Sequence, residues 1–202
     1  MRLSSGHEEK SEVTASATPG VLPPDSAARK RIPLCTGMLD YFPEAYNAAA
    51  CAYYEFVAPR ADYDYNDEND LVEYIVEALR TRTHLARAVA CALELLRREV
   101  GDSRSGAKNF FDRYALALCA VAEVSWHGNE KHNPGQPLHH ARGKSADHAD
   151  CILRHLVERG GFDGPIRHSA ALAWRCLALL QETLEAAGAP LARGARLPEP
   201  TP

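Results

Sequence analysis

Residues 169–184 read "SAALAWRCLALLQETL", and this stretch indicates the fold class most clearly. Apolar side chains occupy most sides of the helical wheel rather than one face, which is typical of a helix at the buried centre of a bundle. "FDGP" precedes it and puts Pro165 near the helix start, while Gly188 and Pro190 act as a stop. We therefore expect a central helix that continues to about Ala187.

The other periodic segments of the chain also have helical spacing. Helices are expected from Pro43 to Pro59, around residues 71–79, from a Thr83 N-cap to Gly101, from about Asn109 to Trp126, and from a Ser145 N-cap to Arg159. No segment alternates between apolar and polar residues with period two. The sequence thus predicts an all-α fold, a single bundle of about six helices.

The two ends of the chain differ in composition from this bundle. Residues 1–30 are rich in Ser, Glu, Ala and Pro and lack apolar periodicity, so they bury too little surface to offset the entropy of ordering. Residues 189–202 form a proline-spaced stretch. We expect a disordered leader at 1–30, one all-α domain at 31–188 and a flexible tail at 189–202.

Composition argues against several classes of protein. The 202 residues are 46% apolar and 25% charged with a net charge of −4, which argues against broad nucleic-acid binding because that binding needs Lys and Arg to neutralise phosphates. With no apolar run of about 18 residues and no signal-peptide pattern, we expect no membrane span and a cytoplasmic protein. The six cysteines are scattered without a CxxC, so neither disulfides nor a cysteine zinc site is expected.

Histidine is concentrated in residues 126–156, "WHGNEKHNPGQPLHHARGKSADHADCILRHL", which hold six of the nine histidines. Gly and Pro make the first half an expected irregular loop. This loop supplies the candidate substrate-binding residues Asn129, Lys131, His132, Asn133, His139 and Lys144. Because a helix N-terminus follows, we expect the loop to bind a phosphate-bearing ligand.

The helix expected at 145–159 carries a pair of carboxylates. Asp147 and Asp150, at i and i+3, lie on one flank together with Arg154. Mg²⁺ accepts carboxylates at this spacing, so both are candidate metal ligands, joined by Glu130 from the loop. Alternatively, Asp147 only stabilises the helix N-terminus and Asp150 pairs with Arg154. His148 and His155 line the other flank.

A last histidine, His168, is expected in the first turn of the central helix, where it can project toward the same opening. Zinc is a minority alternative to Mg²⁺. Its candidate ligand pairs are His127 with His132, His139 with His140, and His148 with His155. None of these pairs reproduces HExxH or a short Cys/His framework.

"GNEKHNPGQPLHHARGKSADHADCILRHL" followed by "IRHSAALAWRCLALLQETLE" resembles a phage-associated family of dATP/dGTP diphosphohydrolases. The similarity covers "IPLCTGMLDYFPEA" near residue 32 and then roughly residues 107–187, so 44–105 looks like a helical insertion and 106–188 like the family core. The resemblance implies a small helical, phage-encoded enzyme that cleaves purine dNTPs to dNMP and pyrophosphate with Mg²⁺.

Position by position, the resemblance covers three groups of residues. Lys131, His132 and Asn133 match a KHN-type turn, Asp150, Arg154 and His155 match a D-x-x-x-R-H helix, and His168 matches a final histidine. The chain departs from the pattern at Ala171 and Arg175, where relatives have a second His and an Asn.

These observations together predict an Mg²⁺-dependent nucleotide pyrophosphohydrolase in the cytoplasm of a phage-infected host. Asp147, Asp150 and Glu130 would hold the metal, while Lys131, Lys144 and Arg154 would bind phosphates. His155 or His168 would orient the attacking water. The alternatives are a nucleotide-binding or counter-defence protein without turnover and a structural helical adaptor. A homo-oligomer is also expected.

Overall fold

The computed structural model describes residues 25–58, 67–102, 107 and 109–198, and within these ranges the predicted all-α fold is confirmed. In the described ranges, the longer helices are α2 (Pro43–Ala52), α3 (Glu68–Thr81), α4 (Leu85–Glu99), α5 (Phe110–His132), α6 (His148–Val157) and α7 (His168–Ala186). The described ranges add a short α1 (Ser26–Arg29) and two π-helical segments, η1 (Cys35–Leu39) and η2 (Tyr53–Val57). Most of the expected leader, residues 1–24, lies outside the described residues.

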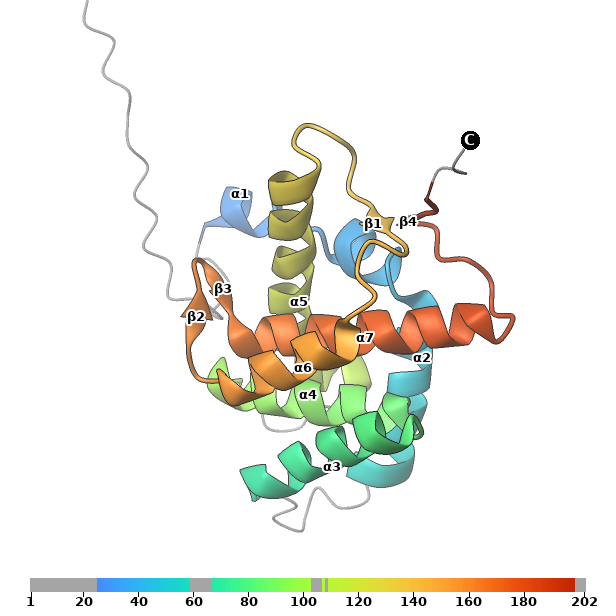
Figure 1. The fold of residues 1–202 in the computed structure, drawn as a ribbon. Helices are drawn as coiled ribbons and strands as arrows, with labels where there is room; N and C mark the ends of the chain where they lie inside the picture. Colours follow the sequence, from blue (N-terminus) through green and yellow to red (C-terminus); the bar gives the residue numbers. More distant parts are fainter. Residues whose placement is uncertain (1–24, 59–66, 103–106, 108, 199–202) are drawn as a thin grey trace, which may run out of the picture.

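Helix α7 crosses the middle of the bundle, with α6 alongside it, α5 rising from it and α4 and α3 below (Figure 1). It packs against α2, α4, α5 and α6. Its partner α4 is buried without interruption from Ala88 to Leu96, because it lies between α3 on one side and α7 on the other. The prediction of a central α7 is thus confirmed.

The segment 44–105 shares this core with the rest of the chain. It contributes α2 and α4, both of which pack on α7. Whether it is an insertion relative to a family stays a prediction. Across the described part of the chain, none of the helices combines the length and hydrophobicity that crossing a bilayer requires.

Helix α5 is longer than its sequence predicts. The expected end is Trp126, but the helix continues to His132. A helical glycine such as Gly128 costs only about 1 kcal/mol relative to alanine. The buried Asn129 gives this last part a tertiary anchor, since its Nδ2 donates to the carbonyl oxygen of Gln136 at 3.0 Å. Glu130, Lys131 and His132 therefore project from a helix rather than from a loop.

Two predicted N-caps are wrong. Helix α4 starts after His84, which has a left-handed φ of 54°, while the Thr83 hydroxyl shares a hydrogen bond with Thr81 Oγ1 at 2.8 Å. Helix α6 starts after Asp147 rather than Ser145, with Asp147 at φ −111° and ψ 28°. Side chains expected in the first turn of α6 therefore lie in the approach to the helix.

The expected flexible tail is packed against the bundle over residues 189–198. Strand β4 (Ala195–Arg196) pairs in parallel with β1 (His140–Ala141), and the Gly194 N–H donates to the Asp40 carbonyl at 2.7 Å. A Cβ at Gly194 would meet Tyr41 Cδ1 at 2.8 Å, so only glycine fits this close approach. The composition of residues 189–202 predicts a flexible tail. In the structure, small residues such as Gly194 and Ala195 let its backbone pair with β1.

The connection between α6 and α7 is a short hairpin of β2 (Phe162–Asp163) and β3 (Ile166–Arg167), which pair antiparallel. Gly164 in its turn has a φ of 58°, a conformation that favours glycine. The hairpin returns the chain so that α7 begins immediately at His168. The end of α6 and the start of α7 are thereby held close together.

Candidate functional site

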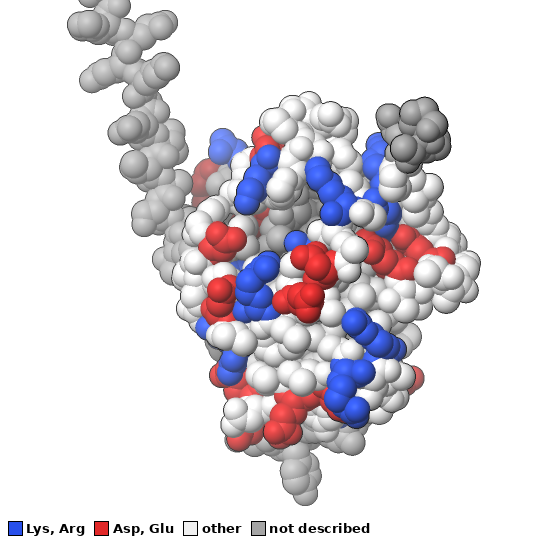
Figure 2. Space-filling model, in the orientation of Figure 1, with Lys and Arg blue, Asp and Glu red and all other residues white. Residues whose placement is uncertain are grey.

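A cavity of about 600 Å³ lies between the C-terminal half of α5, the segment around β1, the β2–β3 turn and α7. This volume falls within the range of about 300–1,000 Å³ that small-molecule sites occupy. Seven of the predicted site residues line it: Asn129, Lys131, His132, Asn133, His139, Lys144 and His155. Figure 2 shows this face hollowed below the α5–β1 connection, with Lys and Arg side chains on both sides.

Five predicted residues are not among the described residues that line this cavity: Glu130, Asp147, Asp150, Arg154 and His168. Asp147 and Asp150 are exposed, and the Asp147 carboxylate accepts from the Cys151 thiol at 3.4 Å. That hydrogen bond is the main reason why the pKa of Asp147 is lowered. Within the described residues, no cluster of three potential metal ligands includes Glu130, Asp147 or Asp150. The described residues therefore do not bring these three side chains together as one cluster of metal ligands, and the Mg²⁺ site stays a prediction.

The cavity is lined by three basic side chains, Lys131, Lys144 and Arg175, and Asp163 is the one acidic side chain among the described residues that line it. Arg175 lines the cavity but was not among the residues expected to bind a ligand. A signal for it existed, because Arg175 is the only charged residue between His168 and Glu182 in an otherwise apolar helix. A charge in such a helix usually faces a ligand or a polar opening.

Trp174 packs against the hydrophobic core and also forms part of the cavity wall. Its indole Nε1 donates to Ser125 Oγ at 2.8 Å. Its ring contacts Phe42 edge-on at a centroid distance of 5.4 Å and His140 at 5.0 Å. These contacts fix the indole against the bundle, so it offers a rigid aromatic surface to a ligand.

Asn129, predicted to bind substrate, is engaged in holding the chain around the end of α5. Besides its bond to Gln136, its carbonyl oxygen accepts from the Asn133 N–H at 2.7 Å. Its Oδ1 also lies 3.4 Å from Asn133 Nδ2. Asn129 is buried, and its hydrogen bonds hold the chain where it leaves α5.

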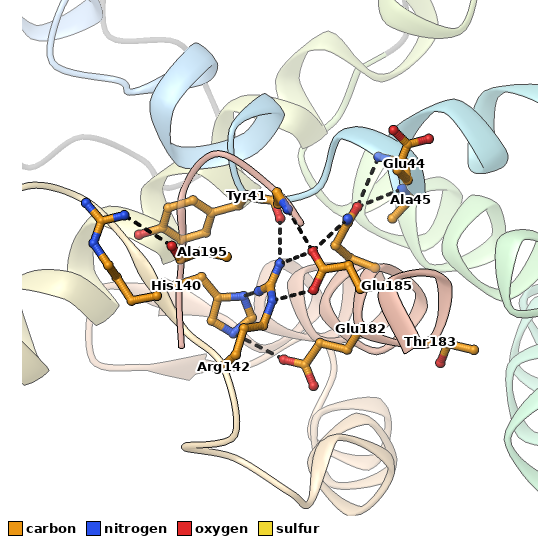
Figure 3. A network of polar contacts seen from close by, with 12 residues as sticks. Tyr41, Glu44, Ala45, His140, Arg142, Glu182, Thr183, Glu185 and Ala195 are labelled. Carbon is orange, nitrogen blue, oxygen red and sulfur yellow. Dashed lines mark hydrogen bonds and ion pairs between the residues drawn. The ribbon is translucent and has the colours of Figure 1, made fainter. Parts of the chain in front are cut away.

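Arg142 forms the buried polar support behind the cavity (Figure 3). Its Nε and Nη2 donate to Glu185 Oε2 and Oε1, each at 2.8 Å, and Nη2 also donates to the Tyr41 carbonyl. A further guanidinium nitrogen, Nη1, contacts His140 Nδ1. Because a guanidinium can only donate, His140 Nδ1 is an acceptor and the ring proton is on Nε2.

His140 is a neutral histidine under ordinary conditions. Its pKa is lowered to about 3, first because burial disfavours the charged ring and then because Arg142, His148 and Arg175 are close. It lies between the cavity and the Arg142–Glu185 pair. Protonation of His140 would place a second positive charge beside a buried guanidinium.

The depressed pKa of His140 predicts a pH dependence of stability. The unfolded chain binds a proton at about pH 6.5 and the folded chain only near 3, so the stabilisation is complete above about pH 6.5 and is lost as the pH falls. The expected slope reaches about 1.4 kcal/mol per pH unit in that window. Urea unfolding at a series of pH values measures it. His140→Gln, whose amide can still accept from Arg142, should flatten the slope, and an unchanged slope would contradict this assignment.

His155 and His168 meet beside the cavity. Their Nδ1 atoms are 3.0 Å apart, and His168 Nδ1 lies 3.2 Å from Glu158 Oε2. The pKa of His155 is lowered to about 4, mainly by burial and then by Arg154 and His168. His155 therefore offers a neutral imidazole to the cavity, with His168 behind it.

Comparisons with protein-family models, with curated proteins and with solved structures find no match to this chain. The family similarity expected from the sequence accordingly stays a prediction. The geometry of the cavity is the basis for the function proposed below.

Proposed function

We propose that the protein hydrolyses purine deoxynucleoside triphosphates to the monophosphate and pyrophosphate in the cavity lined by Lys131, Arg175 and His155. The observation that carries the proposal is the meeting of seven sequence-predicted residues in one opening of nucleotide size. These residues come from the end of α5, the segment that follows it and α6. A concave pocket into which several polar side chains converge is the usual form of a ligand-binding site.

The charge of the cavity supports a polyphosphate as the ligand. Lys131, Lys144 and Arg175 supply up to three positive charges, against the single carboxylate of Asp163 among the described residues lining it. Phosphoryl chemistry depends mainly on positioning the phosphates and on neutralising their charge. The indole of Trp174 supplies an apolar wall against which a purine can pack.

The neutral imidazole of His155 supports a role in positioning. Its Nδ1 is turned toward His168, which leaves the other ring nitrogen for a hydrogen bond to a phosphate oxygen or to the attacking water. In the reaction, water oxygen bonds to the α-phosphorus while the bond to the bridging oxygen of pyrophosphate breaks. His155 would hold one of these oxygens in place rather than form a covalent intermediate.

Mg²⁺ held by Asp147, Asp150 and Glu130 does not fit this geometry, because these side chains do not converge within the described residues. The proposal therefore assigns no step to a metal on those residues. Arg175 lines the cavity, whereas Arg154 is exposed on α6. The proposal therefore assigns phosphate binding to Arg175 in place of Arg154.

A nucleotide-binding protein without turnover is the second candidate. It is favoured by the low number of carboxylates around the cavity, since Asp163 alone among the described lining residues could join a phosphate-bound cation. It is also favoured by Ala171 and Arg175, which replace a histidine and an asparagine expected from the resemblance. In that case the same cations bind nucleotide, and no pyrophosphate is released.

A turnover assay separates these candidates. The protein is incubated with each dNTP and Mg²⁺ and the products are resolved, with a parallel binding measurement in EDTA. We expect purine dNMP and pyrophosphate, and at least about a tenfold loss in His155→Gln, the scale of one hydrogen bond to a charged group. Asp150→Asn should keep the activity, because Asp150 is exposed outside the cavity. Binding without products would favour the second candidate.

If Asp150→Asn lost activity while His155→Gln kept it, the cavity would not be the catalytic site. The exposed flank of α6 would then be the better candidate. Loss of stability alone in both variants would instead favour a structural adaptor. The cytoplasm of a phage-infected host as the setting, a homo-oligomeric state and the lack of nucleic-acid binding are further predictions that accompany this proposal.

A further inference from the structure

We propose that His155, Glu158 and His168 bind one divalent ion of the zinc class at the junction of α6 and α7. This proposal goes beyond nucleotide hydrolysis and does not rest on it. His155 is in the last turn of α6, Glu158 is the C-cap of that helix, and His168 is the first residue of α7. The β2–β3 hairpin joins the two helices and brings the three side chains together.

The distances within the cluster are close to those of a metal site. His155 Nδ1 and His168 Nδ1 are 3.0 Å apart, and His168 Nδ1 and Glu158 Oε2 are 3.2 Å apart. Each of the three residues offers a ligand atom within 4.8 Å of those of the other two. Zinc binds imidazole nitrogen at about 2.0–2.1 Å, so tetrahedral ligand atoms lie about 3.3 Å apart. Small rotations of exposed Glu158 would complete the geometry.

The chemistry of the donors favours zinc over magnesium. Two imidazoles and one carboxylate form a donor set that catalytic zinc sites use, with the fourth position open to water. Magnesium prefers an all-oxygen set and dehydrates reluctantly. A chain that offers two nitrogen atoms and one carboxylate therefore selects an ion such as Zn²⁺ or Co²⁺.

The cluster of His155, Glu158 and His168 has fewer N–H donors than acceptor atoms. Each neutral imidazole carries a single N–H, while three atoms with lone pairs, on His155, Glu158 and His168, face one another. One N–H on His168 Nδ1 can be shared between its two neighbours, but His155 Nδ1 and Glu158 Oε2 then compete for it. A cation at the centre would satisfy all three lone pairs.

A second cluster in the protein provides a contrast. His140, His148 and Glu182 also lie within 4.8 Å of one another. Their ring Nδ1 atoms, however, face guanidinium donors, Arg142 for His140 and Arg175 at 3.3 Å for His148. Each ring proton must therefore be on Nε2, the atom directed at Glu182. A protonated Nε2 has no lone pair for a metal, and that of His148 lies 3.3 Å from Glu182 Oε1.

Access and rigidity suit the proposed site. The Glu158 side chain is 46% exposed and the His168 side chain 13%, so an ion can enter from solvent on the Glu158 side. Gly161 ties the two helices, because its N–H donates to the Glu158 carbonyl and its carbonyl accepts from the His168 N–H. With Nδ1 bound to the metal, His155 would carry its proton on Nε2. The ion would therefore make His155 Nε2 a hydrogen-bond donor in a residue that lines the cavity.

The test is a metal titration without nucleotide. Chelator-stripped full-length protein, with the exposed Cys35 and Cys51 replaced by serine in all forms, is titrated with Co²⁺ by visible absorption and with Zn²⁺ against a chromophoric chelator. We expect one ion per chain in this parent. Glu158→Gln and His168→Gln should each raise the Kd on the order of tenfold or more. The matched control Glu182→Gln should leave it unchanged.

Absence of stoichiometric binding in the parent protein would overturn the proposal. So would a loss of binding in Glu182→Gln together with full binding in Glu158→Gln, which would assign the ion to the contrasting cluster. Far-ultraviolet circular dichroism verifies folding, and the exposed Glu158 keeps the test valid if His168→Gln does not fold. Since the titration contains no nucleotide, its outcome is separate from that of the turnover assay.

Discussion

Replacing Glu185 with alanine is expected to lower the free energy of unfolding by about 3–5 kcal/mol. Glu185 accepts two hydrogen bonds from Arg142 at 2.8 Å, and the two side chains are 11% and 6% exposed. Its Oε1 also accepts from the Ala192 N–H at 3.0 Å and from Gln181 Nε2 at 2.9 Å. Removing the carboxylate leaves a buried guanidinium without a countercharge and releases the segment that follows α7.

Urea unfolding of the wild-type protein and the variant measures this loss. Arg80→Ala is the comparison, because the Arg80–Glu77 ion pair is exposed and its removal should change stability little. The double variant Arg142→Leu, Glu185→Leu should recover part of the stability, since no unpaired charge stays buried. If Glu185→Ala were no more destabilising than Arg80→Ala, Arg142 would not be the support of the cavity.

Replacing Arg175 with methionine is expected to raise the Kd for a purine dNTP roughly 10- to 150-fold. A hydrogen bond to a charged group contributes about 1.5–3 kcal/mol, and about 1.4 kcal/mol corresponds to a factor of ten. The Arg175 guanidinium carbon lies 5.4 Å from the centre of the Trp174 ring, so methionine removes both the charge and this cation–π contact. Isothermal titration in EDTA measures the affinity without turnover.

Arg154→Met is the matched comparison for Arg175→Met. Arg154 is an arginine of α6 that does not line the cavity within the described residues, and its Nη2 contacts Cys151 Sγ at 3.4 Å. Its replacement should leave nucleotide affinity unchanged. The reverse pattern, with binding lost in Arg154→Met alone, would favour the flank of α6 that the sequence resemblance indicates.

The centre of the fold was predictable because its signal is local. Residues 169–184 are apolar around the whole helix, so no arrangement other than a buried one satisfies them. The end of α5 was not predictable from composition, because Gly128 and the polar residues after it are typical of a loop. The buried Asn129 stabilises the helix end there through its hydrogen bonds to Gln136 and Asn133.

Seven of the expected site residues line the cavity, but the flank of α6 that faces the cavity was not predictable. On a helical wheel, Asp147 and Asp150 lie on one flank of α6 and His155 on the other. One cavity cannot receive both flanks, and the wheel alone does not say which flank faces inward. Packing of α6 on α7 decides it, since it buries His148 and His155 and leaves Asp150 exposed.

The buried ion pair of Arg142 and Glu185 behind the cavity was also not predicted from the sequence. Arg142 and Glu185 are 43 residues apart, and the segment that carries Ala192 and Gly194 has the composition of a tail. Buried ion pairs between distant positions carry no local sequence signal. Their presence follows only once β1 pairs with β4 and brings Arg142 over α7.

The fluorescence of Trp174 reports whether the cavity beside it binds a nucleoside triphosphate. The chain has two tryptophans, and Trp126 is 45% exposed, so Trp126→Phe leaves Trp174 as the sole reporter. We predict a saturable change in Trp174 fluorescence when dATP is titrated in EDTA, after correction for the absorbance of dATP with free tryptophan. The midpoint of this change should match the calorimetric Kd and should shift in Arg175→Met. Calorimetric binding of dATP with unchanged Trp174 fluorescence, or no binding at all, would contradict nucleotide binding in this cavity.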